Sequence, residues 1–195
     1  MEFDDVQIAL CDLEKLIPDA VAQALRDENP DNLLKWLREK LPEYAEPGFW
    51  EEAPPGGLNA FAAQCRHLIW NSLPVPGNNF LPRPLPQPGR NDPGPCGSEL
   101  KYKWCCAALP KPSSPDPLNL WPFVLDQVPK QKLDEALAKN RLPLEGVIAA
   151  AMNHLGDEGH EKAVDLLEPL FGGSLKKPRP GLEVALERCR GWRRS

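Results

Sequence analysis

Proline dominates the middle of this chain. Thirteen of its 24 prolines lie between residues 74 and 122 of the 195-residue sequence. A proline has no backbone N–H to donate, and its ring clashes with the preceding helical turn. We therefore expect regular helix to be largely excluded from residues 74–122, apart from a short cysteine-containing core. The proline-rich arms on either side of that core are typical of semi-rigid, extended spacers.

Both flanks of this window show the apolar spacing of amphipathic helices. The N-terminal pattern starts with Val6, Leu10, Leu13 and Ile17, and we expect Pro18 to open a second helix because proline suits the first helical position. Helical spacing continues through Leu33, Leu37 and Leu41, and again over residues 58–72. No strand pattern appears. The sequence thus predicts an all-α fold, with helical segments flanking a small, irregular, zinc-knuckle-like insert.

Helical spacing resumes after the window, over residues 132–138, 144–155, 160–171 and 182–189. The turn at residues 156–159 joins two of these segments, which predicts an αα-hairpin. We expect three regions: an N-terminal helical region (1–73), a proline-rich linker (74–122) that contains a small module at 88–107, and a C-terminal helical region (123–195).

Cysteine use points to metal chemistry. Three of the six cysteines, Cys96, Cys105 and Cys106, lie close together inside the proline-rich window. The other three, Cys11, Cys65 and Cys189, are scattered along apolar helical stripes, where a small buried hydrophobe is the expected role. This distribution is not a disulfide framework, and it suits a reducing compartment in which thiolates bind metal.

The stretch from Gly89 to Cys106 reads GRNDPGPCGSELKYKWCC and resembles the SEC-C motif, a small zinc-binding module also found at the end of the bacterial translocation ATPase SecA. The family pattern is roughly G-R-N-D-P-C-P-C-G-S-x-x-K-Y-K-x-C-[CH]. Here Gly94 stands in place of the first cysteine. The resemblance implies zinc bound by Cys96, Cys105 and Cys106. Three outcomes stay open: a water as fourth ligand, a donor from elsewhere such as His67, or no metal.

The same resemblance implies protein docking through the module. Its candidate binding residues are Lys101, Tyr102, Lys103 and Trp104. The two lysines would offset the negative charge of the thiolates. Trp104 precedes Cys105, so it either caps a binding face or shields the metal site from water.

Charge is unevenly distributed along the chain. Residues 1–60 carry 14 acidic and 5 basic side chains, whereas residues 176–195 carry 7 basic and 2 acidic ones. A basic tail can touch nucleic acid, although cations near a helix C-terminus are also favourable in themselves.

Two functions from different classes fit these features. We expect a non-enzymatic adaptor with a protein partner. The alternative is a nucleic-acid- or ribosome-associated protein that uses Lys101, Lys103 and the tail. The sequence has no phosphate-binding glycine loop, no nucleophile elbow and no metalloprotease motif. The longest apolar run, Val147 to Met152, is too short for a membrane span, so we expect a cytoplasmic protein.

Overall fold

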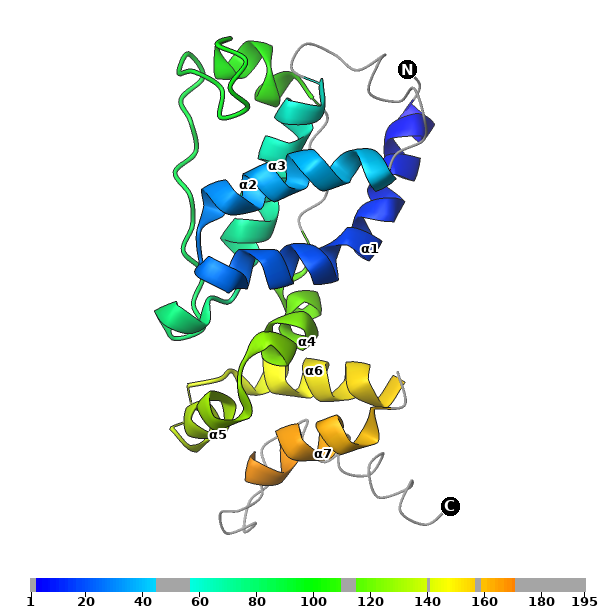
Figure 1. Ribbon diagram of the computed structural model, residues 1–195, viewed down its shortest axis with the longest axis vertical. Helices are drawn as coiled ribbons and strands as arrows, with labels where there is room; N and C mark the ends of the chain where they lie inside the picture. The colour runs from blue at the N-terminus through cyan, green and yellow to red at the C-terminus, as the bar shows by residue number, and fades with distance from the viewer. Residues whose placement is uncertain (1–2, 45–56, 110–114, 140, 157–158, 171–195) are drawn as a thin grey trace. The chain divides into compact units, whose positions relative to one another are not determined.

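The structure is a computed structural model that describes residues 3–44, 57–109, 115–139, 141–156 and 159–170. It is all-α: the described residues form seven α-helices and several short 3₁₀ turns, and they contain no strand (Figure 1). The chain divides into two compact units, Met1–Asp116 and Pro117–Ser195, which are described separately. None of the described helices is both long enough and apolar enough to cross a membrane.

Three helices build the first unit. They are α1 (Phe3–Asp27), α2 (Pro30–Lys40) and α3 (Gly57–Ser72), and a 3₁₀ turn (Leu41–Tyr44) extends α2. Asn29 caps α2, because its side-chain oxygen accepts a hydrogen bond from the Asp31 backbone N–H at 2.9 Å. Apolar side chains spaced along the three helices meet in one core, which contains Leu16, Val21, Ala24, Leu33, Leu37, Leu41, Ala60, Phe61, Ile69 and Trp70.

The expected helix break at Pro18 was wrong. Helix α1 runs through Pro18 without interruption. An internal proline costs the helix one hydrogen bond, about 3 kcal/mol of helix stability in an isolated setting. Buried Leu16 lies just before this proline and buried Ala20 and Val21 just after it, so the apolar stripe continues across it. Packing of that stripe outweighs the local preference.

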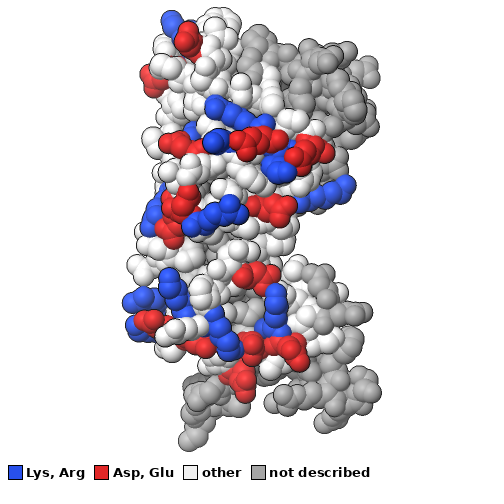
Figure 2. Space-filling view, viewed as in Figure 1, with Lys and Arg blue, Asp and Glu red and all other residues white. Residues whose placement is uncertain are grey.

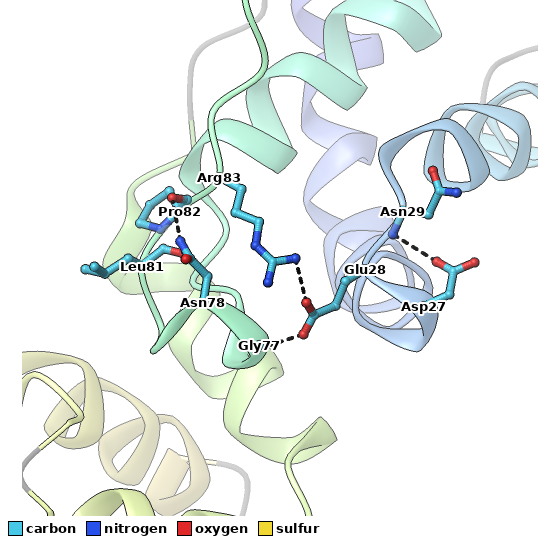
Figure 3. A network of polar contacts seen from close by, with 8 residues as sticks. All are labelled: Asp27, Glu28, Asn29, Gly77, Asn78, Leu81, Pro82 and Arg83. Atoms are coloured by element: carbon cyan, nitrogen blue, oxygen red, sulfur yellow. Dashed lines mark hydrogen bonds and ion pairs between the residues drawn. The ribbon is translucent and has the colours of Figure 1, made fainter.

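The proline-rich arm after α3 packs on the helices instead of standing clear as a spacer. It leaves the end of α3 through a 3₁₀ turn (Pro76–Asn78) and runs back beside α3 (Figure 1). Figure 3 shows how the turn is tied down: the Glu28 carboxylate accepts from the Gly77 N–H at 2.8 Å and from Arg83 Nη1 at 2.7 Å. Further along, the Leu85 N–H donates to Asn71 Oδ1 at 2.7 Å. The arm therefore carries the cysteine-containing segment back along the helices.

Four helices build the second unit: α4 (Pro117–Gln127), α5 (Lys130–Ala138), α6 (Leu144–Gly156) and α7 (His160–Leu167), followed by a 3₁₀ turn (Glu168–Leu170). Helices α6 and α7 pack against each other as a hairpin, and α4 packs on α6. The buried side chains come from all four helices and include Leu120, Trp121, Val124, Leu137, Val147, Ala150, Ala163 and Leu167. The predicted helix at 182–189 and the basic tail lie outside the described residues.

The expected exclusion of helix from 74–122 was wrong at its C-terminal end. Helix α4 starts inside the window, at Pro117, and includes Pro122. Pro117 occupies the first position, where its missing N–H has no intrahelical partner in any case. Pro122 is buried together with Leu120 and Trp121, and this apolar burial offsets the lost hydrogen bond.

Candidate metal centre

The cysteine-containing segment, residues 89–109, is a small, compact stretch of irregular backbone in the first unit. Two stretches of it run antiparallel: the Gly94 N–H donates to the Leu100 carbonyl at 2.9 Å, and the Tyr102 N–H donates to the Asp92 carbonyl at 2.7 Å. The segment contains two 3₁₀ turns, Tyr102–Trp104 and Cys106–Ala108. The break between the turns lies at Cys105.

The turn between these stretches brings Cys96 toward the other cysteines. Gly97 has a φ of +75°, a conformation that glycine adopts without steric cost, and its N–H donates to the Gly94 carbonyl at 3.2 Å. Ser98 then lies beside the first thiol, with its Oγ 3.1 Å from Cys96 Sγ.

Cys96, Cys105 and Cys106 form one buried cluster. Their three sulfur atoms all lie within 4.8 Å of one another. The Cys105 and Cys106 sulfurs are 3.9 Å apart. The three residues are only 2 %, 0 % and 1 % exposed, so the cluster is shielded from solvent. Three convergent thiols away from water form a donor set for a thiophilic metal ion.

Gly94 borders this cluster from the side. A Cβ built on Gly94 would lie 2.2 Å from Cys105 Sγ, 3.3 Å from Cys96 Sγ and 3.6 Å from Cys106 Sγ. A side chain at this position would therefore project into the sulfur cluster. With glycine here, the Cys105 sulfur occupies that space.

The thiols differ in how readily they ionise. Burial raises the pKa of Cys96, but hydrogen bonds from Ser98 and the neighbouring thiols outweigh it, so this pKa lies below its ordinary value. Burial, together with the hydrogen bond and charge of Cys96, raises the pKa of Cys106 to about 12. Without a metal, Cys96 therefore ionises at a lower pH than Cys106.

Side chains from α2 and α3 hold the backbone of this cluster. Gln64 Nε2 donates to the Cys106 carbonyl at 2.5 Å and to the Leu109 carbonyl at 3.4 Å. Arg38 Nη2 donates to the Cys96 carbonyl at 2.9 Å. Two of the three cysteines are thus fixed in place by the helices.

A comparison with protein families agrees with this geometry. Residues 90–108 match the family model of the SEC-C motif. This segment is a SEC-C motif. The match covers 19 residues of the chain, and a search of curated proteins and a search of solved structures found no match. The comparison therefore supports the module alone and carries no information about the helices around it.

The SEC-C module and α3 enclose a pocket of about 220 Å³. Its walls are His67 and neighbouring residues of α3, the arm prolines Pro86 and Pro88, and Tyr102 and Cys106 of the module. Sequence reasoning considered His67 as a fourth ligand, but His67 is not part of the sulfur cluster: its Nε2 lies 2.9 Å from Asn71 Nδ2. Within the described residues, no His, Asp or Glu joins the three cysteines.

The four proposed binding residues of the SEC-C module lie in different surroundings. Lys101 is exposed, and Lys103 Nζ lies 5.3 Å from the centre of the Trp104 ring. Trp104 is 62 % exposed, which suits the first of its two expected roles, capping a binding face, better than shielding the metal site. Tyr102 is half-buried in the pocket wall, and burial followed by the charge of Cys106 raises its pKa.

Sequence reasoning missed Gln64 and Arg38, which donate hydrogen bonds to the module from outside, and Arg66, which lines its pocket. Arg66 is 12 % exposed and borders the same pocket as Cys106. These residues carry no local signal, because Gln64 is 42 positions from Cys106 and Arg38 is 58 positions from Cys96.

The residues present fit a metal ion. For ion–sulfur bonds of about 2.3 Å, neighbouring sulfurs lie about 3.8 Å apart in a tetrahedral site and about 4.0 Å apart in a planar three-ligand site. The observed 3.9 Å between Cys105 and Cys106 lies between these values. Cys96, Cys105 and Cys106 are thus the residues that would hold the ion.

Proposed function

We propose that this protein is a non-enzymatic, metal-binding interaction protein in which the SEC-C module is carried on a helical body. The clustering of three buried cysteine sulfurs within 4.8 Å supports this proposal most directly. The motif implies zinc, which three thiolates bind with one further donor. A bound ion would cross-link Cys96 to the Cys105–Cys106 turn and so fix the shape of the module. The cytoplasm suits such a site, because its reducing conditions keep thiols free.

A protein partner is favoured by the exposed apolar surface of the module. Trp104 is 62 % exposed and Leu100 is 41 % exposed. Tryptophan is prominent among the residues that contribute most to protein interfaces, because it buries a large apolar area at low entropic cost. Lys103 beside the ring adds a cation, which suits a partner with an acidic residue next to an apolar one.

The nucleic-acid alternative has less support from the described surface. On the face shown in Figure 2, lysine and arginine side chains alternate with aspartate and glutamate instead of gathering by sign. Phosphate binding requires a basic stripe, and its affinity falls steeply with salt. Binding that is lost between 50 and about 200 mM salt would favour this alternative, whereas an apolar contact at Trp104 would survive.

Elemental analysis of the purified, reduced protein tests the metal-binding half of the proposal. We expect thiophilic metal to copurify with the wild type and to be lost when Cys96, Cys105 and Cys106 are all replaced by serine. Equal metal content in both proteins, or none in either, would argue against the proposal.

The partner half of the proposal is tested by measuring which protein binds to the immobilised chain, before and after its metal is removed with a chelator. Trp104→Ala should lose a specific bound protein that the wild type retains. Leu118→Ala removes another exposed apolar side chain, 42 % exposed and outside the SEC-C module, and should have no effect. Loss of binding in both variants, or in neither, would contradict docking through the module.

A further inference from the structure

The fourth coordination position decides which ion this SEC-C module holds. A closed zinc site has four ligands, and the motif supplies the first of them from the residue at position 94. Gly94 supplies none. Moreover, the Cys105 sulfur lies only 2.2 Å from where a Cβ of residue 94 would be. The Cys105 sulfur thus fills part of the space that a side chain at position 94 would take.

Within the described residues no other side chain replaces that ligand. In the part of the chain that the structure describes, no His, Asp or Glu lies within reach of the three sulfurs. Ser98 contacts the cluster, with its Oγ 3.1 Å from Cys96 Sγ. A neutral hydroxyl is a poor donor beside thiolates, and hard oxygen donors suit magnesium or calcium better than soft ions.

Water has little access to the cluster. Cys105 is fully buried, and Cys96 and Cys106 are 2 % and 1 % exposed. The neighbouring pocket reaches the wall formed by Cys106 but leaves only that 1 % accessible. A catalytic zinc site keeps its open position facing a water-filled cavity, and this cluster does not.

We infer that the cluster binds copper(I) through three thiolates and holds zinc only weakly. This inference rests on the proposed metal-binding function and names its ion. Thiolates are soft donors that select copper(I) as well as zinc. Copper(I) is satisfied by three thiolates, whereas zinc without a fourth donor is under-coordinated. The 3.9 Å between the Cys105 and Cys106 sulfurs is compatible with a three-ligand site as well as with a tetrahedral one.

A copper(I) site carries more negative charge than a zinc site, and arginines on α2 and α3 can offset part of it. Three thiolates give a net charge of −2 with copper(I), against −1 with zinc. Arg38 donates to the Cys96 carbonyl at 2.9 Å, which brings one cation to the cluster. Arg66 borders the pocket beside Cys106 and is 12 % exposed, while its own partner Asp31 is 83 % exposed and largely screened by solvent. Two arginines therefore lie near the cluster, one bonded to the Cys96 carbonyl and the other lining the pocket that Cys106 borders.

The test is a pair of competition titrations on the full-length, reduced protein under argon. Copper(I), added as its acetonitrile complex, competes against bicinchoninate; zinc competes against a chromogenic zinc chelator. We expect one copper(I) per chain, with three thiol protons released to solvent and no change of oxidation state. X-ray absorption of the copper-loaded protein should show three sulfur neighbours and no oxygen or nitrogen.

Two variants at one position make the test specific. Gly94→Cys restores the fourth thiolate and should raise zinc affinity by about a hundredfold or more, with a change of less than about tenfold for copper(I). Gly94→Ala places the same Cβ against Cys105 Sγ without adding a ligand, so it should weaken binding of both ions, a loss that the added thiolate of Gly94→Cys offsets. Far-ultraviolet circular dichroism checks that all three proteins keep their helices.

The outcomes separate this inference from the proposed function. Zinc bound one-to-one by the wild type as tightly as by Gly94→Cys would overturn the copper(I) assignment and leave metal binding intact. A four-neighbour copper site would overturn it as well. Failure of the wild type to bind either ion would overturn both proposals.

Discussion

Gln64 and Cys106 lie 42 positions apart in the chain, yet Gln64 Nε2 donates a hydrogen bond to the Cys106 carbonyl at 2.5 Å. Gln64 is buried in the middle of α3, and Cys106 contributes one of the three clustered sulfurs. The same amide nitrogen lies 3.4 Å from the Leu109 carbonyl. One side chain of the helical body therefore holds the backbone that presents a candidate metal ligand.

Replacing Gln64 by leucine should destabilise the first unit and weaken metal binding together. The change leaves the Cys106 carbonyl buried without its donor, which costs about 1–3 kcal/mol. We expect a lower urea midpoint and a severalfold weaker metal affinity. Gln131→Leu, an exposed substitution on α5, is the control and should change neither quantity. Unchanged metal affinity in a destabilised Gln64→Leu protein would show that the contact does not position Cys106.

The sequence predicted the fold class, because apolar side chains at helical spacing define the faces of α2, α3, α6 and α7. The all-α prediction is confirmed. The two helix boundaries at Pro18 and near Pro122 were wrong for one reason. Local proline geometry argued for a break, but burial of the flanking apolar residues favoured continuity. Local rules predict such positions poorly, since tertiary packing decides them.

The SEC-C motif was recognisable from the sequence because its cysteines, glycines and lysines follow a fixed local spacing. The sulfur cluster follows from a turn at Gly97 and two short 3₁₀ turns, which are all local structure. The contacts of Arg38 and Gln64 with the module could not be predicted, because they join side chains to backbone carbonyls distant in the chain. Such contacts depend on how the module packs on the helices.

Removing metal should leave the helices in place. The first unit buries its own apolar core, with Leu16, Leu33 and Leu37 almost fully inaccessible, so folding does not depend on the ion. We expect a strong chelator to lower the melting temperature slightly and to preserve the far-ultraviolet helical signal. The second unit, which contains none of the three clustered cysteines, serves as an internal reference. Loss of most helical signal on chelation would contradict this prediction.

Alkaline pH should destabilise the first unit through Cys65. Burial on α3 raises the pKa of this thiol to about 12, against an ordinary value of 9.0. Between those values the unfolded chain ionises Cys65 while the folded chain does not. Stability is therefore unaffected below about pH 9 and falls above it, by at most about 1.4 kcal/mol per pH unit.

Cys65→Ala isolates this effect, because alanine cannot ionise. Its cost relative to the wild type should be constant from pH 6 to 8 and should shrink as pH rises from 9 toward 11. Urea unfolding at a series of pH values measures the difference. A constant difference across the whole range would show that Cys65 ionises equally in both states.

Gly146 on α6 should tolerate no side chain. A Cβ at this position would lie 2.5 Å from two ring carbons of Trp121, which is itself 5 % exposed in the core of the second unit. Both partners are fixed, the ring by burial and the glycine by the helix backbone, so Gly146→Ala forces α4 and α6 apart. We expect a loss of about 1–3 kcal/mol, although alanine is intrinsically the better helix former.

Gly156→Ala is a matched control on the same helix, because a Cβ there meets nothing within 4 Å. It should leave stability unchanged or raise it slightly, as measured by urea unfolding of the two variants side by side. Equal stabilities would mean that α4 and α6 do not approach as closely as the contact between Gly146 and Trp121 requires.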